Sequence, residues 1–441
     1  MGNFKSKIKS TIIYKALKVA KRQCKDIIAD CKTISYFRKK NKENKNILNK
    51  QNQKIKVAFL CQYIPAWNKF EPIYKMMKAD DRFEPYIVCV PSQMENYKLI
   101  DSKLKDNDTY DYFIEEGYTT SDVVNALVGE DRWYDLKGLK CSYVFYTRPY
   151  NYYMPKAYTS EVVREYAKIC SLIYGMNMTK DIFNVTMNTD FYKDVYIYYA
   201  ETKSAMKMYK RKFPITSLLG WRKVYFYGLP AFEQILNDKD DKSTSWDFSK
   251  NEFRVMWTPR WTTDPKLGGT NFFLYYKGLL DYATKNKDVD FLFRPHPLTF
   301  DNFIKTGEMT KNEVDEYVSS IEGMENVSLD REKEYDGTMW NSSVLISDIS
   351  GFMPEYFVTG KPIIYCASNM ILTLAEHTKE LLKGCYISYT QEETYRYLGQ
   401  FKEGHDPLKE KRKEIVAELF GDNLNNSTSR IVESLYFLHT D

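Results

Sequence analysis

The feature that most constrains this chain is a repeated alternation of short apolar runs with segments of helical spacing. Apolar runs such as VAFLCQYI at 57–64 and SYVFYT at 142–147 are each followed by helix-like segments, and the pattern restarts with RVMWT at 254–258. Strands that alternate with helices form a parallel sheet with helices on both faces. The sequence therefore predicts an α/β fold of two doubly wound, Rossmann-like domains.

A charged stretch rich in serine and threonine separates the two series, and we expect it to be an interdomain linker. The expected organisation is a basic amphipathic helix at 1–37, a polar linker at 38–55, an N-terminal Rossmann-like domain at 56–236, a linker at 237–252 and a C-terminal Rossmann-like domain at 253–441.

The charge of the chain is concentrated at its N-terminus. Residues 1–56 carry 17 basic and 3 acidic side chains, which leaves 47 basic and 56 acidic side chains for the rest of the chain. A nucleic-acid-binding protein is more often basic across its binding face, so we expect no nucleic-acid partner. A basic arm on a mildly acidic body fits an anionic membrane surface better.

Residues 4–37 are predicted to form one helix with an apolar stripe. Apolar residues recur at alternating spacings of four and three, and lysines and an arginine occupy much of the remaining surface. Such a helix can lie in the headgroup region of a membrane, and it can equally dock on the protein's own body or pair with a copy of itself. The stripe consists of Ile13, Leu17, Ala20, Cys24, Ile27, Cys31 and Ile34.

The eight cysteines are widely spread and include no CxxC pair, which is typical of buried free thiols in a reducing compartment. The chain has no apolar run near 18 residues and no continuous apolar segment at its basic N-terminus. We therefore expect neither a membrane-spanning helix nor a signal peptide. The expected location is cytoplasmic, peripheral on the inner face of the cell membrane.

Three polar clusters follow predicted strands of the second domain. The first, WTPRWTTDPKLGG, places Arg260 after a strand and a glycine pair before a helix, where an anion can bind or where the loop is only a helix start. The second, FLFRPHPLTF, contains Arg294 and His296. Arginine offers planar donors to phosphate, and histidine can donate a hydrogen bond or exchange a proton near neutral pH. A purely structural histidine at a strand end is the alternative.

The third cluster is LISDISGFMPEYF. Ser347, Asp348, Ser350 and Gly351 lie between a strand and a helix, where they can bind a diphosphate or simply cap the helix. Glu355, about one turn into that helix, can bond a ribose diol. Because all three clusters end strands of one sheet, we expect them to converge on one site. The sequence indicates no metal site and no cofactor.

In the order WTPRW, RPHP, SDISGFMPEY and GKPIIY, and in the segment GDNLNNSTSRIVESL, the chain resembles the CDP-glycerol glycerophosphotransferase family of teichoic-acid and capsule synthesis. The resemblance covers about residues 56–437. It implies a GT-B-like fold whose C-terminal domain binds a CDP-activated polyol, while the N-terminal domain binds the acceptor. Glycerol phosphate or ribitol phosphate would pass to a hydroxyl of a lipid- or glycan-linked acceptor, with release of CMP.

The resemblance also implies roles for individual residues. His296 falls on a catalytic histidine of the family, with Arg294 beside it. Ser347, Asp348 and Ser350 fall on the diphosphate-binding loop, and Ser429 and Arg430 fall on a C-terminal segment near the phosphates. From its own position after a strand, Arg260 is expected to stabilise the same phosphates.

The chain departs from the family pattern in its first domain. Polymerising members carry a histidine in an HGT-like motif, whereas this chain has Tyr174 before Gly175 and no histidine before His296. Asp181, Tyr174 and Glu71 are candidates for its replacement as the base. Two other functions therefore stay open, namely a GT-B glycosyltransferase that uses a sugar nucleotide in capsule or cell-surface polysaccharide synthesis, and a non-catalytic membrane-associated scaffold.

Overall fold

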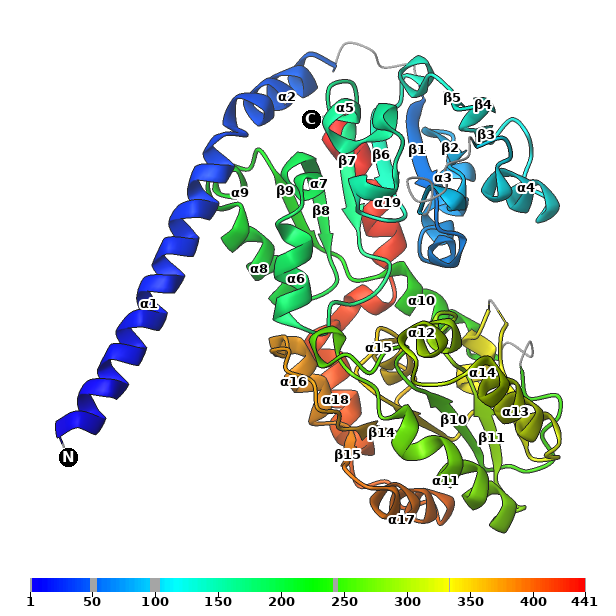
Figure 1. The fold of residues 1–441 in the computed structure, drawn as a ribbon. Coiled ribbons are helices and arrows are strands. Elements are labelled where there is room, and N and C mark those ends of the chain that lie inside the picture. The colour runs from blue at the N-terminus through cyan, green and yellow to red at the C-terminus, as the bar shows by residue number, and fades with distance from the viewer. Residues whose placement is uncertain (1, 48–53, 96–103, 241–244, 333, 441) are drawn as a thin grey trace. The chain divides into compact units, whose positions relative to one another are not determined.

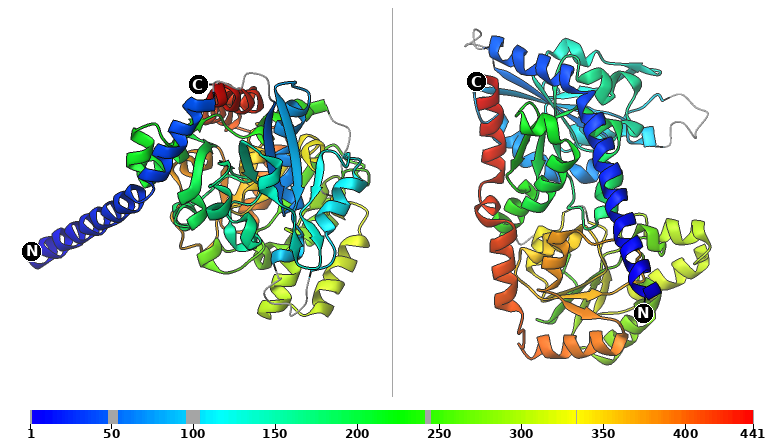
Figure 2. Two further views of the ribbon diagram at one scale, coloured as in Figure 1. Left: turned by 90° about the horizontal axis from the view of Figure 1, so that it is seen from above. Right: turned by 90° about the vertical axis from the view of Figure 1, so that its left-hand side faces the viewer.

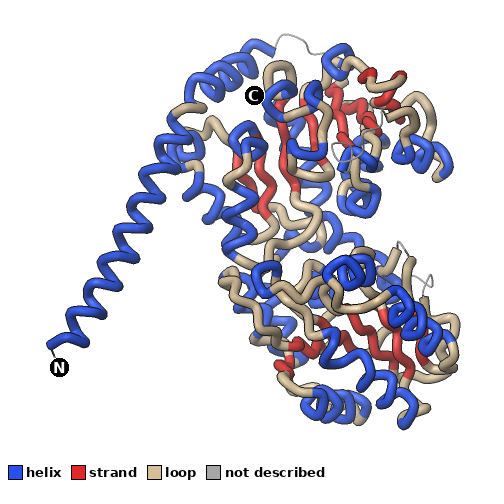
Figure 3. Tube along the Cα trace, viewed as in Figure 1, coloured by secondary structure: helices blue, strands red, loops and turns tan. Residues whose placement is uncertain are grey.

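A computed structural model describes residues 2–47, 54–95, 104–240, 245–332 and 334–440 (Figure 1). The chain forms two compact units. Unit 1 consists of Met1–Tyr174, Val185–Leu229 and Asn426–Asp441, and unit 2 of Gly175–Asn184 and Pro230–Asn425. Each unit is built on one parallel sheet flanked by helices (Figures 2 and 3). The predicted α/β fold with two doubly wound domains is confirmed.

Unit 1 contains a seven-stranded sheet in the order β3-β2-β1-β6-β7-β8-β9, in which every neighbouring pair is parallel. All six residues of β8, VYIYYA, are buried, as expected for a strand with both faces covered. The strands are β1 (Ile55–Cys61), β2 (Phe83–Cys89), β3 (Val123–Asn125), β6 (Tyr143–Tyr146), β7 (Lys168–Leu172), β8 (Val195–Ala200) and β9 (Lys223–Phe226), and a hairpin pairs β4 (Leu127–Gly129) with β5 (Arg132–Trp133).

The helices that accompany the strands of unit 1 are mostly short. They are α1 (Gly2–Cys31), α2 (Ile34–Ile47), α3 (Glu71–Lys78), α4 (Asp108–Glu115), α5 (Ser160–Val163), α7 (Asp190–Asp194), α8 (Lys203–Lys212), α9 (Pro214–Leu218) and α19 (Ser427–Thr440), while α6 (Lys180–Met187) crosses the boundary between the units. None of the helices in the described ranges is both long and apolar enough to traverse a bilayer.

Unit 2 contains a six-stranded parallel sheet in the order β12-β11-β10-β13-β14-β15. Its core is aromatic: the ring of Trp257 on β10 stacks on Phe272 at 5.5 Å and on Phe293 of β11 at 4.6 Å between centroids. The strands are β10 (Arg254–Thr258), β11 (Asp290–Phe293), β12 (Val327–Leu329), β13 (Val344–Ser347), β14 (Ile363–Cys366) and β15 (Tyr386–Ser388).

The helices of unit 2 lie between these strands and after the last of them, except α10, which precedes the first strand. They are α10 (Pro230–Asn237), α11 (Phe272–Lys285), α12 (Thr299–Thr306), α13 (Lys311–Glu322), α14 (Asp336–Trp340), α15 (Phe352–Phe357), α16 (Glu376–Leu382), α17 (Gln391–Lys402) and α18 (Lys409–Leu419).

The N-terminal arm differs from the single helix expected at 4–37. It breaks after Cys31, and α2 continues to Ile47, so the first part of the expected linker at 38–55 is helical. Residues 48–53 lie outside the described residues. The second helix is fastened to the body of unit 1, because the Asn41 side chain donates to Trp221 O and the Tyr36 hydroxyl donates to Arg164 O.

Two acidic residues fasten α1 to unit 1. Asp30 is fully buried and accepts hydrogen bonds from the backbone N–H groups of Ile215 and Thr216 at 2.7 and 2.9 Å, so it caps the N-terminus of α9. Asp26 pairs with Lys212. These residues lie on a different side of the helix from the predicted apolar stripe. The described stripe residues from 17 to 31 are exposed, with Leu17 at 63% and Ile27 at 40%.

The two units also differ from the expected boundaries at 56–236, 237–252 and 253–441. Helix α10 belongs to unit 2, as does the segment Gly175–Asn184, which comes between two strands of unit 1. The last helix, α19, belongs to unit 1, because the hydroxyl of Tyr143 on β6 donates to Leu435 O and that of Tyr199 on β8 bonds Ser434.

The segment Gly175–Asn184 is held to unit 2 by backbone and side-chain bonds. Thr179 forms a bridge with Leu374, and Lys180 N donates to Thr373 O at 2.8 Å. His377 on α16 is buried, and its Nε2 forms a 2.7 Å hydrogen bond with Asn177 O. A chain segment can thus leave one sheet, join the other unit and return.

Candidate functional site

The strand order of unit 2 reverses direction between β10 and β13. In open parallel α/β sheets, ligands bind beyond the carboxyl ends of the strands at such a switch point. Arg260 follows β10, the loop 347–351 follows β13, and His296 follows the neighbouring strand β11. Three sequence-predicted clusters therefore come to the same edge of the sheet, on both sides of its switch point.

Arg260 is joined directly to the loop after β13. Its backbone N–H donates to Asp348 Oδ2 at 2.9 Å, and its guanidinium donates to Ile349 O at 2.8 Å. Burial lowers the pKa of Arg260 and the neighbouring Asp348 carboxylate raises it. The ordinary pKa of arginine is so high that the side chain remains a cation at pH 7. The first and third predicted clusters are thus one structure.

Gly268 gives the Arg260 side chain the room that this position requires. Its φ is +111°, a conformation that L side chains rarely adopt, and a Cβ built there would lie 2.5 Å from Arg260 Nε. The glycine pair that the sequence offered as an anion site therefore has a second use, which is to let the guanidinium lie close against the loop.

Asp348 organises these loops, which corrects its expected place among the phosphate ligands. Only 2% of the residue is exposed, and its carboxylate accepts hydrogen bonds from Arg260 N, the Thr270 hydroxyl at 2.7 Å and Asn271 N at 3.3 Å. Asn271 precedes α11, so the anion at the start of that helix is the protein's own carboxylate. Burial, the dominant cause, raises the pKa of Asp348 to about 6, although these hydrogen bonds lower it.

Within the serine loop, the structure separates buried from accessible groups. Ser347 is fully buried, and its hydroxyl donates to a backbone carbonyl and accepts from the Thr258 hydroxyl at 3.0 Å. It joins β13 to β10 and is not presented to a ligand. Ser350 and Gly351 are only half-buried, and a Cβ at Gly351 would meet open space. They are the loop groups that a phosphate can reach.

The orientation of His296 is fixed by its own backbone turn. The N–H of Leu298 donates to Nδ1 of the imidazole at 3.1 Å, while Thr299 N donates to His296 O at 2.8 Å. Since Nδ1 accepts a hydrogen bond, the proton of the neutral ring is on Nε2. The imidazole therefore presents an N–H donor outward, and protonating it would place two hydrogens against each other at Nδ1.

The charge state of His296 agrees with that tautomer. Desolvation and, second, the positive charge of Arg260 lower its pKa to about 4. Because the residue is exposed, solvent reaches the ring, and this reduces the effect of desolvation on the pKa of His296. Either contribution alone leaves the imidazole neutral at pH 7, so His296 is a hydrogen-bond donor rather than a cation.

Arg294 lies in a second group at the same edge. Its guanidinium donates to the buried carboxylate of Asp330 at 2.6 Å and to Glu332 O at 2.7 Å, and it lies 4.7 Å from the ring centroid of Tyr335. The Tyr335 hydroxyl in turn donates to Glu355 at 2.6 Å. Arg294 and Glu355 are thus connected through one tyrosine, and their catalytic and ribose-binding roles stay predictions.

The C-terminal pair belongs to the other unit. Ser429 donates to Asn426 O at 3.1 Å, and the guanidinium of Arg430 lies 5.9 Å from the Tyr227 ring centroid, all within unit 1. Their expected approach to the donor phosphates therefore stays a prediction.

The three candidates for a replacement base are placed as follows. Asp181 is exposed and accepts from Thr373 N at 2.5 Å in unit 2. Glu71 pairs with Lys75 at 2.9 Å and accepts from the Tyr118 hydroxyl. Burial raises the pKa of Tyr174 above its ordinary value, so its phenol is protonated at neutral pH. None of the three geometries is that of a free carboxylate or phenolate poised to remove a proton.

Among the described residues, no group of three or more His, Cys, Asp or Glu side chains is arranged to hold a metal ion.

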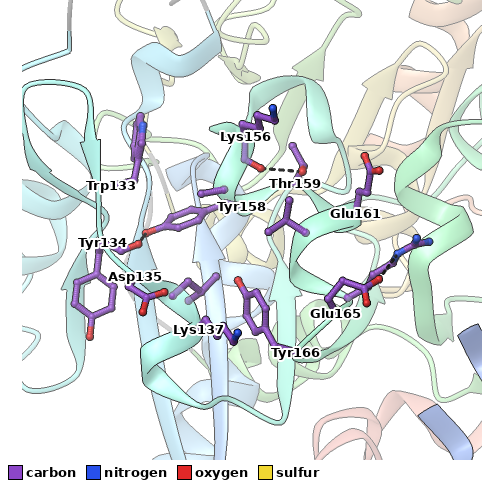
Figure 4. Close-up of a pocket in the computed structure, with 14 residues that line it drawn as sticks. Trp133, Tyr134, Asp135, Lys137, Lys156, Tyr158, Thr159, Glu161, Glu165 and Tyr166 are labelled. Carbon is purple, nitrogen blue, oxygen red and sulfur yellow. Dashed lines mark hydrogen bonds and ion pairs between the residues drawn. The ribbon is translucent and has the colours of Figure 1, made fainter. Parts of the chain in front are cut away.

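A pocket of about 790 Å³ opens on unit 1, away from the carboxyl ends of its strands (Figure 4). It is lined by residues that precede β6, such as Trp133 and Tyr134, and by Tyr166, which precedes β7. The Tyr158 hydroxyl donates to Tyr134 O at 2.9 Å across it. Because the pocket adjoins the amino ends of β6 and β7, it does not share the strand edge that binds ligands in such sheets.

Comparison with known families decides the class of the protein. The profile of the family described as CDP-glycerol:poly(glycerophosphate) glycerophosphotransferase matches residues 100–436. The chain belongs to this family. The resemblance inferred from the short motifs is thereby confirmed, and the protein is an enzyme of the glycerophosphotransferase type. Comparison with curated protein sequences gives no match.

Solved structures of the same fold include a wall teichoic acid polymerase and nucleotide-bound enzymes. A variant of the wall teichoic acid polymerase TagF, soaked with CDPG, has a TM-score of 0.57 and 13% identity over 95% of this chain and 98% of that one. The S. aureus MnaA–UDP complex has a TM-score of 0.56 and 13% identity over 88% and 98%. The UDP-GlcNAc 2-epimerase from Neisseria meningitidis, bound to UDP-GlcNAc, has a TM-score of 0.56 and 12% identity over 87% and 100%. These likenesses show the fold.

Sequence reasoning missed several residues that shape the edge of the glycerophosphotransferase sheet. Asp330 directly follows the short strand VSL, so a polar residue directly after an apolar run could have marked it, as it marked Arg294 after DFLF. Tyr335 had no such signal, since its link to Arg294 and Glu355 depends on the path of a loop. The backbone donor of Leu298 is set by local geometry that the motif RPHP does not disclose.

Proposed function

We propose that the protein transfers glycerol phosphate or ribitol phosphate from a CDP-activated donor to a hydroxyl of a teichoic-acid or capsule-type acceptor, with release of CMP. The family supports the type of reaction. The observation that carries the donor site is the junction of Arg260 with the 347–351 loop at the switch point of unit 2, beside the Nε2–H of His296.

The proposed reaction is an in-line displacement at the phosphorus that carries the polyol. A bond forms between the acceptor oxygen and this phosphorus, and the bond from phosphorus to the bridging oxygen of the diphosphate breaks. The electron pair leaves with CMP, and the proton of the acceptor hydroxyl passes to solvent or to a base. Charge on the phosphate oxygens must be stabilised throughout, so positioned donors contribute most of the catalysis.

Each residue of the donor site would stabilise the phosphate charge through a different group. Arg260 supplies a fixed positive charge with planar N–H groups. His296 supplies one neutral N–H whose direction is set by the Leu298 hydrogen bond, and Ser350 with Gly351 supplies a hydroxyl and a backbone N–H. Ser347 and Asp348 hold the loop in place without touching the donor.

Substitution of His296 tests the proposal. Because His296 presents a donor, we expect His296→Ala to lower CMP release from CDP-glycerol by about 100-fold, the usual effect of losing one oxyanion donor. Glutamine can place an amide N–H near the position of Nε2, so His296→Gln should recover part of the rate. His405→Ala is the control, since His405 is exposed in the same unit. Equal CMP release by His296→Ala and the parent contradicts the role.

The nature of the nucleotide is tested by binding. Thermal unfolding of the parent in CDP-glycerol, CDP-ribitol, UDP-sugars and CMP-sugars should show stabilisation by a CDP-polyol, because a ligand stabilises the state it binds. Stabilisation by a sugar nucleotide alone would instead support the glycosyltransferase alternative, and stabilisation by none would support the scaffold.

We propose further that α1 places the enzyme on an anionic membrane, on its inner face, where a lipid-linked acceptor is found. The stripe of Leu17, Ala20, Cys24, Ile27 and Cys31 is exposed, and the arm is fastened through the different side that carries Asp26 and Asp30. Lys18, Lys21, Arg22, Lys25 and Lys32 around the stripe are exposed as well. An uncovered apolar stripe among cations suits an anionic lipid surface.

A further inference from the structure

Unit 1 has a switch point of its own. Its strand order reverses between β1 and β6, so the crevice beyond the carboxyl ends of these two strands is where a ligand of this sheet is expected. Tyr63 follows β1 and Arg148 follows β6. Leu60 pairs with Tyr146 in the sheet, and Thr147 N donates to Leu60 O at 3.1 Å, so the two strand ends stay side by side up to these residues.

Arg148 is held between tyrosine side chains at this switch point. Its guanidinium carbon lies 4.2 Å from the ring centroid of Tyr63 and 4.5 Å from that of Tyr153. Pro149 follows directly and restricts the backbone of Arg148 to extended conformations. The cation is therefore positioned both by its backbone and by two ring faces.

Tyr174 completes the group, at the position where the family resemblance expects a histidine. It follows β7, next to β6 in the sheet, and its ring lies 6.2 Å from that of Tyr63 between centroids. The Arg148 charge acts on its phenol, which burial keeps protonated. Tyr63, Arg148, Tyr153 and Tyr174 are all half-buried, so solvent and ligands reach them. This group offers a cation, O–H donors and ring faces, and it offers no base.

We propose that Arg148, positioned by Tyr63 and Tyr153, is the residue that binds a phosphate of the acceptor and distinguishes phosphate-bearing acceptors from neutral ones. The inference rests on the proposed transferase function. A guanidinium held by ring faces presents its N–H groups in one plane, which is the geometry for a bidentate bond to phosphate. The tyrosine rings offer stacking surfaces to the adjoining polyol or sugar.

The donor diphosphate is the other source of phosphate, so the test separates the two. CMP release is measured with two synthetic acceptors on the same alkyl anchor, one a glycerol phosphate dimer and the other a neutral disaccharide. For Arg148→Ala, kcat/KM with the phosphate-bearing acceptor should fall about 10- to 100-fold, the effect of losing one charge-assisted contact. With the neutral acceptor it should stay within about twofold, and the Kd for CDP-glycerol should be unchanged.

Two further variants separate charge from geometry. Arg148→Lys keeps the charge without the fork and should recover only part of the loss, while Tyr153→Leu keeps the arginine but removes one ring, and should raise KM rather than lower kcat. Arg396→Ala is the matched control, because Arg396 is an exposed arginine 5.1 Å from the Tyr397 ring centroid in unit 2.

The outcomes are distinct. An equal loss with both acceptors, or a weakened Kd for CDP-glycerol in Arg148→Ala, overturns the assignment of Arg148 to the acceptor phosphate while the transferase function stands. Failure of the parent enzyme to bind CDP-glycerol or to release CMP overturns the proposed function, and this inference with it.

Discussion

The buried imidazole of His377 makes the stability of the protein depend on pH in a way that can be calculated. It holds Asn177 O, and with it the segment Gly175–Asn184, while only 1% of the residue is exposed. Desolvation, the largest cause, lowers its pKa to about 4 from 6.5. The folded protein therefore binds this proton less readily than the unfolded chain.

The sign and size follow from that difference. The unfolded state takes up the proton first as the pH falls below 6.5, so stability is fully present at neutral pH and is lost progressively down to pH 4. At about 1.36 kcal/mol per pKa unit, the complete loss is about 3 kcal/mol. About 1.4 kcal/mol of it should be gone at pH 5.5 and about 2.5 kcal/mol at pH 4.5.

The assay compares the parent with His377→Gln by urea unfolding, followed by tryptophan fluorescence at pH 7, 5.5 and 4.5. Glutamine can donate an amide N–H to Asn177 O but does not titrate. We expect the difference in unfolding free energy between the two proteins to change by about 2.5 kcal/mol between pH 7 and pH 4.5, in favour of the variant. Parallel pH dependences of parent and variant would refute the reasoning.

Two predictions remain. Gly268→Ala should push the Arg260 guanidinium off the loop, since a Cβ would lie 2.5 Å from Nε at a φ of +111°, and isothermal titration should show CDP-glycerol binding weakened about tenfold or more. The control is Gly404→Ala, which is also at positive φ but in open space and should leave binding unchanged. Equal affinities of the parent and both variants would count against the placement of Arg260. Replacing Leu17 and Ile27 together by aspartate should abolish flotation of the protein with phosphatidylglycerol vesicles. Val128→Asp, a change at another exposed apolar position, should leave flotation unchanged. Unchanged flotation of the double variant would show that α1 is not the membrane contact.

The predicted fold followed from local patterns, and its departures follow from long-range contacts. Runs such as RVMWT and DFLF became β10 and β11 because buried parallel strands are continuously apolar. The pattern SRIVESLYFL predicts an amphipathic helix but not the sheet it covers, and α19 turned out to belong to unit 1. The N-terminal helix likewise breaks just after Asp30, whose carboxylate caps a helix far along the chain.

The candidate site shows the same division. Arg260, His296 and the 347–351 loop could be found because each directly follows an apolar strand, and parallel strands bring their carboxyl ends to one edge. The sequence could not say which polar side chains of the loop turn inward. Asp348 and Ser347 bond the protein's own backbone and hydroxyls, so the motif that resembles a phosphate loop contains internal supports beside the half-buried groups that a phosphate can reach.

The return of α19 to unit 1 bears on how the chain matures during synthesis. Tyr143 and Tyr199 lie in the middle of the first sheet, yet their hydroxyl partners are made roughly 200 residues after β9 leaves the ribosome. The sheet of unit 1 therefore keeps part of one face uncovered until unit 2 has been synthesised and α19 can pack. A nascent chain stalled before Asn426 would thus expose aromatic surface to chaperones. A fragment that ends at Leu229 would expose the same surface permanently, because it lacks α19.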